Sequence, residues 1–306
     1  MKILLTGAGG QLGTELRPLF SKEDEVIATD LLAPSEPYPG FRTLDLGETA
    51  EVKNLLDQFQ PRVIVNAAAY TQVDQAESDQ SLAMRINADA PGLMAEWAAA
   101  NDAFLMHYST DYVFSGKSQQ PYLETDEPSP VNFYGQSKLA GEQAVAAAGG
   151  RHVILRTAWI YSSHGKNFLR TMLRLGSERD ELSIVNDQLG CPTWARNLAR
   201  VSLMVIEKNM SGDPKNVPLN GLYHYCDSPP CSWYDFAGQI FEAASAQGLI
   251  DKIPALEPVT TDQYPTAAKR PAFSVLDTNK IQQDLRIEPA NVRHSVWACL
   301  EERNEH

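Results

Sequence analysis

Short apolar runs alternate with amphipathic stretches along the first half of the chain. The apolar runs are nearly continuous, which is typical of strands in a parallel sheet that helices cover on both faces. They lie at 2–6, 25–29, 62–68, 104–109 and 152–157. The stretches between them predict helices at 11–20, 49–59, 81–101 and 133–148. Repeated β-α units of this kind predict an α/β fold with a doubly wound parallel sheet.

The pattern changes after about residue 157. Proline-rich loops, "CDSPPC" and "DKIPALEPV", separate helices that we expect at 194–208 and 232–247. We therefore expect residues 1–157 to form the sheet domain, completed by the helix near 194–208. Residues 158–306 should then supply most of a smaller α+β domain.

Charge and composition exclude several classes of partner. The 306 residues carry a formal net charge of −13, from 39 acidic and 26 basic side chains. This balance argues against nucleic acid or an anionic membrane as a partner, because both attract a positive surface. No apolar run approaches the ~20 residues that would span a bilayer. The N-terminus, "MKILLTGAGG", runs directly into a glycine turn and lacks the features of a signal peptide.

Four irregularly spaced cysteines indicate a reduced, cytoplasmic protein. The segment "HYCDSPPC" brings His224, Cys226 and Cys231 together, but no other cluster supplies a fourth ligand at zinc spacing. We expect a short strand and a proline turn there, and no metal.

The glycine turn after the first strand carries the first chemical signal. In "TGAGGQLG", Gly7, Gly10 and Gly13 have the spacing G-x-x-G-x-x-G between a strand and a helix. Glycines allow a tight turn and a close approach of the backbone to a pyrophosphate. Asp30 ends the second expected strand, where a carboxylate can bind an adenosine ribose and repel a 2′-phosphate. These residues predict a dinucleotide site that favours NADH over NADPH without excluding NADPH.

A second signal is "YGQSKLAGEQ" at the start of the helix expected at 133–148. Tyr134 and Lys138 share one helix face, because they are four residues apart. A neighbouring ammonium should lower the pKa of the phenol into a useful range for proton transfer. Ser109 and Thr110 follow the preceding strand and add hydroxyls that can bind a substrate carbonyl oxygen. A surface pair without a function is the plainer alternative for Tyr134 and Lys138.

Several longer segments resemble a known family. They are "NAAAYTQVDQAESD", "STDYVFSG", "PYLETDEPSPVNFYGQSKLAGE", "LRTAWIYSSHGKNF" and "VNDQLGCPT". Together with the glycine turn they are similar to dTDP-4-dehydrorhamnose reductases, of the extended short-chain dehydrogenase/reductase superfamily. The similarity covers nearly the whole chain and becomes weaker from residue 209 onward. It implies a Rossmann-type cofactor domain and a sugar-nucleotide domain.

The resemblance also implies roles for individual residues. The catalytic set would be Thr110, Tyr134 and Lys138. Substrate contacts would come from Val73, Thr110, Asp111 and Trp159. NADPH or NADH would contact Gly7, Gly10, Gln11, Leu12, Gly13, Asp30, Asp45, Leu46, Ala67, Ala68, Ala69, Tyr70, Ser109, Tyr134 and Lys138. Plainer roles exist for some of them: Trp159 as core, Asp111 as a turn cap, and Tyr70 and Tyr112 as packing aromatics.

The implied reaction is reduction of the 4-keto group of dTDP-4-dehydro-β-L-rhamnose to dTDP-L-rhamnose, the last step in making this donor for cell-surface polysaccharides. Some family members bind magnesium at a dimer interface through glutamates. Glu15 matches one ligand, but Arg196 stands where a second glutamate is expected, and a guanidinium cannot bind a cation. We therefore expect no magnesium site, and a monomer or weak homodimer.

Other functions stay open at this stage. A sugar-nucleotide dehydratase would carry Asp–Glu after the threonine, whereas Thr110 is followed by Asp111 and Tyr112. An epimerase of the same superfamily is harder to exclude. A non-catalytic regulatory subunit that uses this fold to bind a partner is a third alternative, which the complete Thr–Tyr–Lys set argues against.

Overall fold

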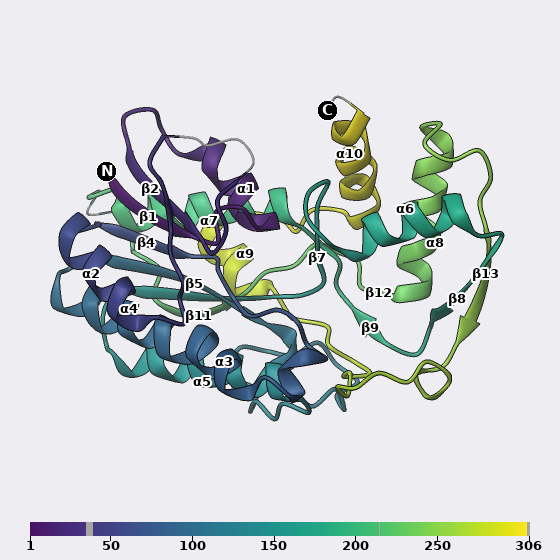
Figure 1. Cartoon of the computed structure of the whole chain (residues 1–306), viewed down its shortest axis with the longest axis horizontal. Coiled ribbons are helices and arrows are strands. Elements are labelled where there is room, and N and C mark those ends of the chain that lie inside the picture. The colour runs from purple at the N-terminus through teal and green to yellow at the C-terminus, as the bar shows by residue number, and fades with distance from the viewer. Residues whose placement is uncertain (35–38, 214, 305–306) are drawn as a thin grey trace.

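The structure is a computed structural model and describes residues 1–34, 39–213 and 215–304. Within them a seven-stranded parallel sheet has the order β11-β6-β5-β4-β1-β2-β3 (Figure 1). The strand order reverses between β1 and β4, and ligands of such sheets bind beyond the carboxyl ends of the strands at that point. The strands are β1 Lys2–Thr6, β2 Glu25–Asp30, β3 Phe41–Thr43, β4 Val63–Asn66, β5 Phe104–Thr110, β6 His152–Thr157 and β11 Gly221–His224.

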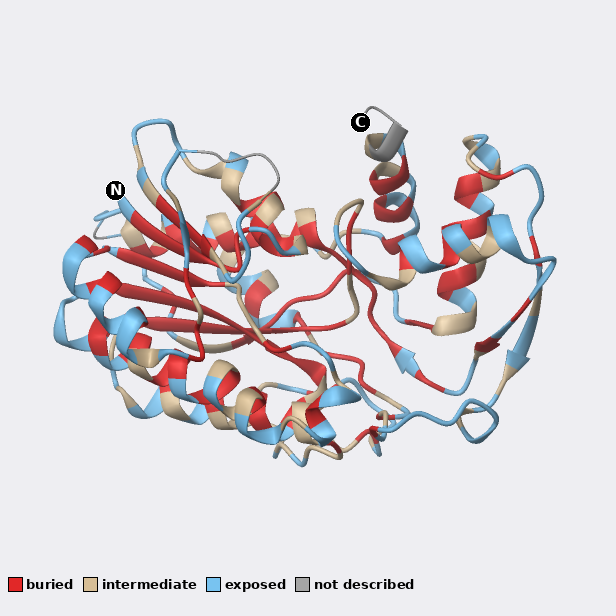
Figure 2. Ribbon diagram, in the orientation of Figure 1, coloured by how far each residue is buried: buried red, intermediate tan, exposed pale blue. Residues whose placement is uncertain are grey.

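Helices cover both faces of this sheet. Successive side chains of a strand point to opposite faces, so Ile3 and Leu5 of β1 pack on one side and Leu4 on the other. The first side is covered by α1 (Gln11–Leu16) and α7 (Ala195–Met210), and the second by α2 (Thr49–Phe59), α4 (Ala90–Ala100) and α5 (Phe133–Ala147). In Figure 2 the central strands are buried along most of their length.

A second core lies beyond the carboxyl ends of the strands. It is built from α6 (Phe168–Glu178), α8 (Trp233–Ala246) and α10 (Val292–Asn304), seen on the right of Figure 1. The short strands of this half are β7 Ile160–Tyr161, β8 Glu181–Val185, β9 Leu189–Gly190, β10 Thr193–Trp194, β12 Cys231–Ser232 and β13 Ala255–Val259. The separate core supports the two-part division, which we keep as a proposal, with α7 and β11 counted in the sheet half.

The predicted doubly wound α/β sheet is confirmed, with two local differences. The strand β3 was not predicted, because it has three residues at a polar edge of the sheet. A short strand was expected before the proline turn near His224, but its place in the main sheet as β11 was not. The helix expected at 81–101 is divided into α3 (Gln80–Met84), a π-helical turn at Arg85–Asp89 and α4. The Asn87 amide in that turn pairs with both the N–H and the carbonyl of Tyr70, at 2.8 and 3.0 Å.

The remaining elements are α9 (Asn279–Leu285) and 3-10 turns at Arg17–Leu19, Gln75–Glu77, Asp111–Val113 and Thr261–Gln263. The four cysteines are buried as free thiols, and both ring nitrogens of His224 have protein partners. Among the residues that the structure describes, no helix combines the length and the apolar character that crossing a membrane requires.

Candidate functional site

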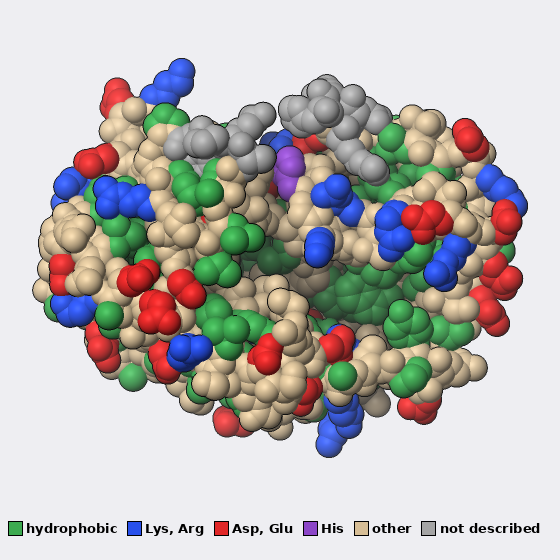
Figure 3. All heavy atoms as spheres, viewed as in Figure 1, with side chains coloured by type: hydrophobic (Ala, Val, Ile, Leu, Met, Phe, Trp, Pro, Cys, Tyr) green, Lys and Arg blue, Asp and Glu red, His purple; other side chains and the backbone are tan. Residues whose placement is uncertain are grey.

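A cavity of about 510 Å³ opens at the carboxyl ends of the sheet strands, where the strand order reverses. Figure 3 shows a hollow between the two halves of the molecule. Most of the residues predicted to bind a cofactor line this cavity. They are Gly7, Gly10, Gln11, Leu12, Asp30, Asp45, Leu46, Ala67, Ala68, Ala69, Ser109, Tyr134 and Lys138.

The glycine turn is held by close backbone contacts. Gly7 has a φ of +68°, and a Cβ there would lie 2.6 Å from the Ala68 nitrogen. A Cβ on Gly13 would lie 2.1 Å from the Gly7 carbonyl oxygen, so only glycine permits α1 to start this close to β1. Gly13 therefore lies beneath the turn and is not among the residues that line the cavity, in contrast to the prediction.

Two carboxylates stand at the end of the cavity formed by β2 and the loop after β3. The Asp30 Oδ2 accepts a hydrogen bond from the Gly9 N–H at 2.8 Å, and its Oδ1 accepts one from the Leu31 N–H at 2.7 Å. The Asp45 Oδ1 accepts one from the Gly47 N–H at 2.7 Å. Fixed carboxylates at this place suit the hydroxyls of a ribose.

The opposite end of the cavity holds two hydroxyls that lack partners. Ser109 Oγ of β5 and Thr157 Oγ1 of β6 are buried and form no hydrogen bond within the described residues. Both residues line the cavity. Since buried polar atoms in proteins are nearly always paired, these hydroxyls fit a polar ligand. The glycine cradle at one side and the free hydroxyls at this end fit a dinucleotide that spans the cavity.

Tyr134 and Lys138 lie on the first turns of α5 and point into the same end of the cavity. The helix begins at Asn132, whose side chain accepts a hydrogen bond from the Gly135 N–H at 2.8 Å. The ammonium of Lys138 is buried and donates to the Tyr108 carbonyl oxygen at 2.6 Å. Burial lowers the pKa of Lys138 to about 8, against an opposing effect of Glu142.

The expected lowering of the tyrosine pKa is not seen. Desolvation raises the pKa of Tyr134 to about 12, with a smaller opposing effect from a hydrogen bond of Thr110. Lys138 directs its ammonium at a backbone carbonyl, and the low dielectric around the phenol disfavours the phenolate more than any nearby charge favours it. Tyr134 is therefore protonated at neutral pH, which suits a proton donor.

Thr110 and Asp111 form a polar pair next to Tyr134. The Thr110 hydroxyl donates to Asp111 Oδ1 at 3.0 Å and accepts from the Tyr112 N–H at 3.2 Å, so Thr110, and not Asp111, caps the turn after β5. Asp111 is buried, which raises its pKa to about 7. Its Oδ2 has no hydrogen-bond partner among the residues described.

Trp159 adopts a strained conformation at the entrance of the second half. Its φ is +46°, a region that non-glycine residues rarely occupy outside functional sites. The indole stacks on Trp233 with ring centroids 3.5 Å apart, and the missing side chain of Gly190 leaves room for it. Trp159 also packs against the hydrophobic cluster around Phe114 and Leu276. Of the expected substrate contacts, Val73, Thr110, Asp111 and Trp159 do not line the cavity described above.

Tyr70, for which a cofactor contact is expected, has its side chain held by a neighbouring carboxylate. Its hydroxyl donates to Asp79 Oδ2 at 3.0 Å, and it is absent from the cavity lining. The sequence reasoning also missed residues that reach the cavity from separate elements and carry no motif of their own. They are Thr6, Thr29, Leu31, Leu44, Thr71, Ile86, Tyr108, Thr157, Ile160, Gly165 and Lys166.

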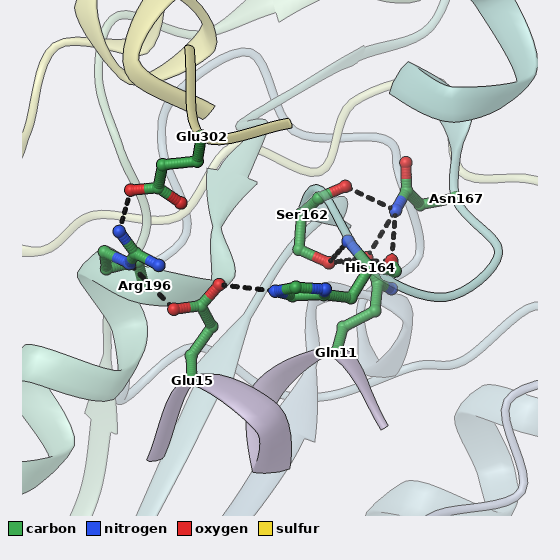
Figure 4. Close-up of polar contacts among 7 residues, drawn as sticks. All are labelled: Gln11, Glu15, Ser162, His164, Asn167, Arg196 and Glu302. Atoms are coloured by element: carbon green, nitrogen blue, oxygen red, sulfur yellow. Dashed lines mark hydrogen bonds and ion pairs between the residues drawn. The ribbon is translucent and has the colours of Figure 1, made fainter. Parts of the chain in front are cut away.

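Arg196 occupies the place considered for a magnesium ligand. Its Nε donates to Glu15 Oε2 at 2.7 Å, and its Nη1 pairs with Glu302 (Figure 4). No group of three or more His, Cys, Asp or Glu side chains suited to a metal is found in the described part of the chain. The guanidinium already pairs with both carboxylates and would repel a cation, so these residues do not fit a divalent metal ion.

Comparison with known proteins identifies the family. The family model described as "RmlD substrate binding domain" matches residues 1–305. The chain belongs to this family. It is 42% identical to the dTDP-4-dehydrorhamnose reductase of Aggregatibacter actinomycetemcomitans, over 96% of this chain and 97% of that protein. It is 42% identical to the enzyme of the same name from Escherichia coli K12, over 94% and 93% of the two chains.

Solved structures agree with this assignment. The dTDP-4-dehydrorhamnose reductase of Bacillus anthracis in complex with NADP has a TM-score of 0.86 at 33% identity, covering 98% of this chain and 99% of that one. A UDP-glucose 4-epimerase of Thermus thermophilus in complex with NAD reaches a TM-score of 0.80 at 18% identity, covering 99% of each chain. The second similarity shows the shared fold alone.

The lowered pKa of Lys138 predicts a pH dependence of the reaction. Above pH 8 the side chain loses its charge, so kcat/KM for keto-sugar reduction should fall by roughly tenfold per pH unit. Tyr134 stays protonated over this range because its pKa is near 12. In Lys138→Arg the fall should disappear below pH 10, since a guanidinium stays charged. Should the fall persist in that variant, it would belong to another group, such as Asp111.

Proposed function

We propose that the protein reduces the 4-keto group of dTDP-4-dehydro-β-L-rhamnose with NAD(P)H and releases dTDP-L-rhamnose. Relatives that share about two fifths of its residues over nearly their whole length carry the name of this reductase. The observation that carries the proposal is the position of Tyr134 and Lys138. Both lie at the end of the dinucleotide-shaped cavity that also holds the free hydroxyls of Ser109 and Thr157.

The residues around Tyr134 account for the proton-transfer half of the reaction. The bound nicotinamide supplies a hydride to C4 of the sugar. Tyr134, protonated at neutral pH, donates its phenolic proton to the oxygen on which negative charge develops. The Thr110 hydroxyl can stabilise that charge by turning its one proton from Asp111 Oδ1 to the substrate oxygen. Lys138 holds the nicotinamide ribose and keeps a positive charge near the phenol.

Two alternatives are less well supported. An epimerase shares the fold, but the Thermus thermophilus epimerase is only 18% identical to this chain. A non-catalytic subunit would not need a buried lysine and a protonated tyrosine at one end of a cofactor cavity. We place the enzyme in the cytoplasm, in keeping with its four free, buried thiols.

The proposed cofactor preference is NADH. Both oxygens of Asp30 are already fixed by backbone N–H groups, so the carboxylate cannot turn away from a 2′-phosphate without losing these hydrogen bonds. The Bacillus anthracis relative was solved with NADP, so the preference concerns this chain and not the family.

We also propose that the protein needs no magnesium and acts as a monomer or a weak homodimer. Arg196 pairs with Glu15 and Glu302 of its own chain. These carboxylates therefore need no metal ion shared between two subunits.

Replacing Tyr134 with Phe tests the proposed function. With freshly prepared dTDP-4-dehydro-β-L-rhamnose, oxidation of NADH at 340 nm should slow by about 10²- to 10⁴-fold, because the proton donor is lost. The dissociation constant of NADH should stay near the wild-type value. Tyr112→Phe is the matched control, since its ring packs edge-on against Tyr134 at 5.8 Å, and it should keep its activity. A wild-type protein that binds NADH but leaves this sugar unreduced would contradict the proposal.

Asp30→Ala should change the cofactor preference. Without the carboxylate, the ratio of the NADPH and NADH dissociation constants should shift toward NADPH by on the order of tenfold, because a like-charge repulsion is removed. Fluorescence titration of each reduced cofactor measures the ratio. An unchanged ratio would show that Asp30 does not face the 2′ position.

Arg196→Glu should create a dependence on magnesium that the wild type lacks. The change leaves three carboxylates together, so the thermal midpoint should drop in EDTA and recover on adding Mg²⁺. Arg196→Gln is the control and should lose stability without any response to the ion. The activity of the wild type should be the same in EDTA and in Mg²⁺. Loss of wild-type activity in EDTA would refute metal independence.

A further inference from the structure

The loop between β7 and α6, residues 162–167, joins the second half of the molecule to the glycine turn. The side-chain oxygen of Gln11, the first residue of α1, accepts hydrogen bonds from Asn167 Nδ2 at 2.8 Å and Ser162 Oγ at 3.1 Å (Figure 4). Gln11 also lines the cofactor cavity. Residues more than 150 positions apart are thereby fixed to each other at the edge of the cavity.

The hydrogen bonds within the loop define its conformation. Asn167 Nδ2 donates to the backbone carbonyls of Ser162 and His164 as well, at 2.9 and 3.0 Å. Its side-chain oxygen accepts from the Arg170 N–H at 3.0 Å and caps α6. Because carbonyls can only accept, the amide of Asn167 must present its nitrogen to Gln11. Gln11 therefore gives its oxygen to the loop and keeps its NH₂ group as a donor.

This loop brings Lys166 to the cavity. Gly165 and Lys166 are both among the lining residues, and a Cβ on Gly165 would lie 3.3 Å from Gln11 Cγ. The loop thus meets the cavity at Gln11, between the carboxylate end and the end that holds Tyr134. In Figure 3, basic side chains lie along the upper rim of the hollow, over β7 and α6.

The charged side chains that line the cavity indicate what Lys166 binds. The described lining residues include two carboxylates, Asp30 and Asp45, and two basic side chains, Lys138 and Lys166. Lys138 is buried at the far end, with its ammonium on the Tyr108 carbonyl. Lys166 is exposed and forms no ion pair with any residue that the structure describes. Among the lining residues that the structure describes, Lys166 is the one cation available to a ligand at the middle of the cavity.

We propose that Lys166 binds the diphosphate of the dinucleotide cofactor, and that the Gln11–Asn167 hydrogen bond holds the loop in position for this contact. The inference rests on the proposed use of NAD(P)H. It adds a cofactor residue from the second half of the chain, so binding of the cofactor engages both halves. A diphosphate is common to NADH, NADPH and ADP-ribose, so all three should depend on Lys166 equally.

The first test is Lys166→Ala, measured as dissociation constants by calorimetry without substrate. NADH, NADPH and ADP-ribose should each bind about tenfold more weakly, as expected for loss of a charged hydrogen bond. The loss should shrink at high salt, because exposed charges are screened. Lys252→Ala is the control, since Lys252 pairs with Asp180 and does not line the cavity, and it should bind all three ligands normally.

The sugar-nucleotide substrate carries a diphosphate as well. Measuring the binding of dTDP to Lys166→Ala shows which of the two diphosphates Lys166 binds. Weaker binding of dTDP alone would overturn the proposal and assign Lys166 to the substrate. Weaker binding of NADPH alone would assign it to the 2′-phosphate and also overturn it. Unchanged dissociation constants for all of these ligands would show that Lys166 binds none of them, and would overturn the proposal. None of these outcomes depends on turnover, so the failure of this inference is distinct from failure of the proposed reductase activity.

The second test concerns the loop. Asn167→Ser removes the amide donors and keeps an oxygen that can cap α6, without changing the charge. If the loop positions Lys166, the effect of Lys166→Ala on NADH binding should fall from about tenfold to less than about threefold in the Asn167→Ser background. Equal effects in the two backgrounds would show that the loop is not needed to place the ammonium.

Discussion

The geometry of the site depends on one close backbone contact, between the start of α1 and the end of β1. Gly13 lies against the Gly7 carbonyl so closely that a single methyl group would separate the two elements. The contact fixes the direction of α1, and with it the positions of Gln11 and Glu15. Gln11 binds the 162–167 loop of the second half, and Glu15 binds Arg196 of α7, which pairs in turn with Glu302 of α10. The glycine turn therefore shapes the cofactor cavity and also orients the two halves.

A stripe of polar side chains along the buried face of α5 connects catalysis to the core. Tyr134, Lys138 and Glu142 are spaced four residues apart, so they lie on the same face of the helix. Glu142 forms a buried bidentate pair with Arg156 of β6, at 2.8 and 2.6 Å. Such a pair adds little net stability because both charges are desolvated. Its value here is geometric: it fixes the rotation of α5, and so the direction of Tyr134.

The fold alone does not determine the reaction of this family. A reductase of Bacillus anthracis and an epimerase of Thermus thermophilus share the architecture, so the sheet alone does not decide the reaction. The strained Trp159, its stack on Trp233 and the missing side chain of Gly190 form a preorganised aromatic wall in the second half of the molecule. Backbone strain of this kind persists only where surrounding contacts enforce it.

The sequence by itself determined the sheet, the glycine turn, Asp30 and the Tyr134–Lys138 pair. These features follow from local patterns, namely apolar runs, the spacing of glycines, and the four-residue spacing that places two side chains on the same face of a helix. Only the tertiary structure decided that Gly13 and Tyr70 lie outside the cavity lining, that burial raises the pKa of Tyr134, and that Lys166 reaches the cofactor cavity. Desolvation and contacts between residues about 150 positions apart depend on how the elements pack. No short stretch of sequence encodes them.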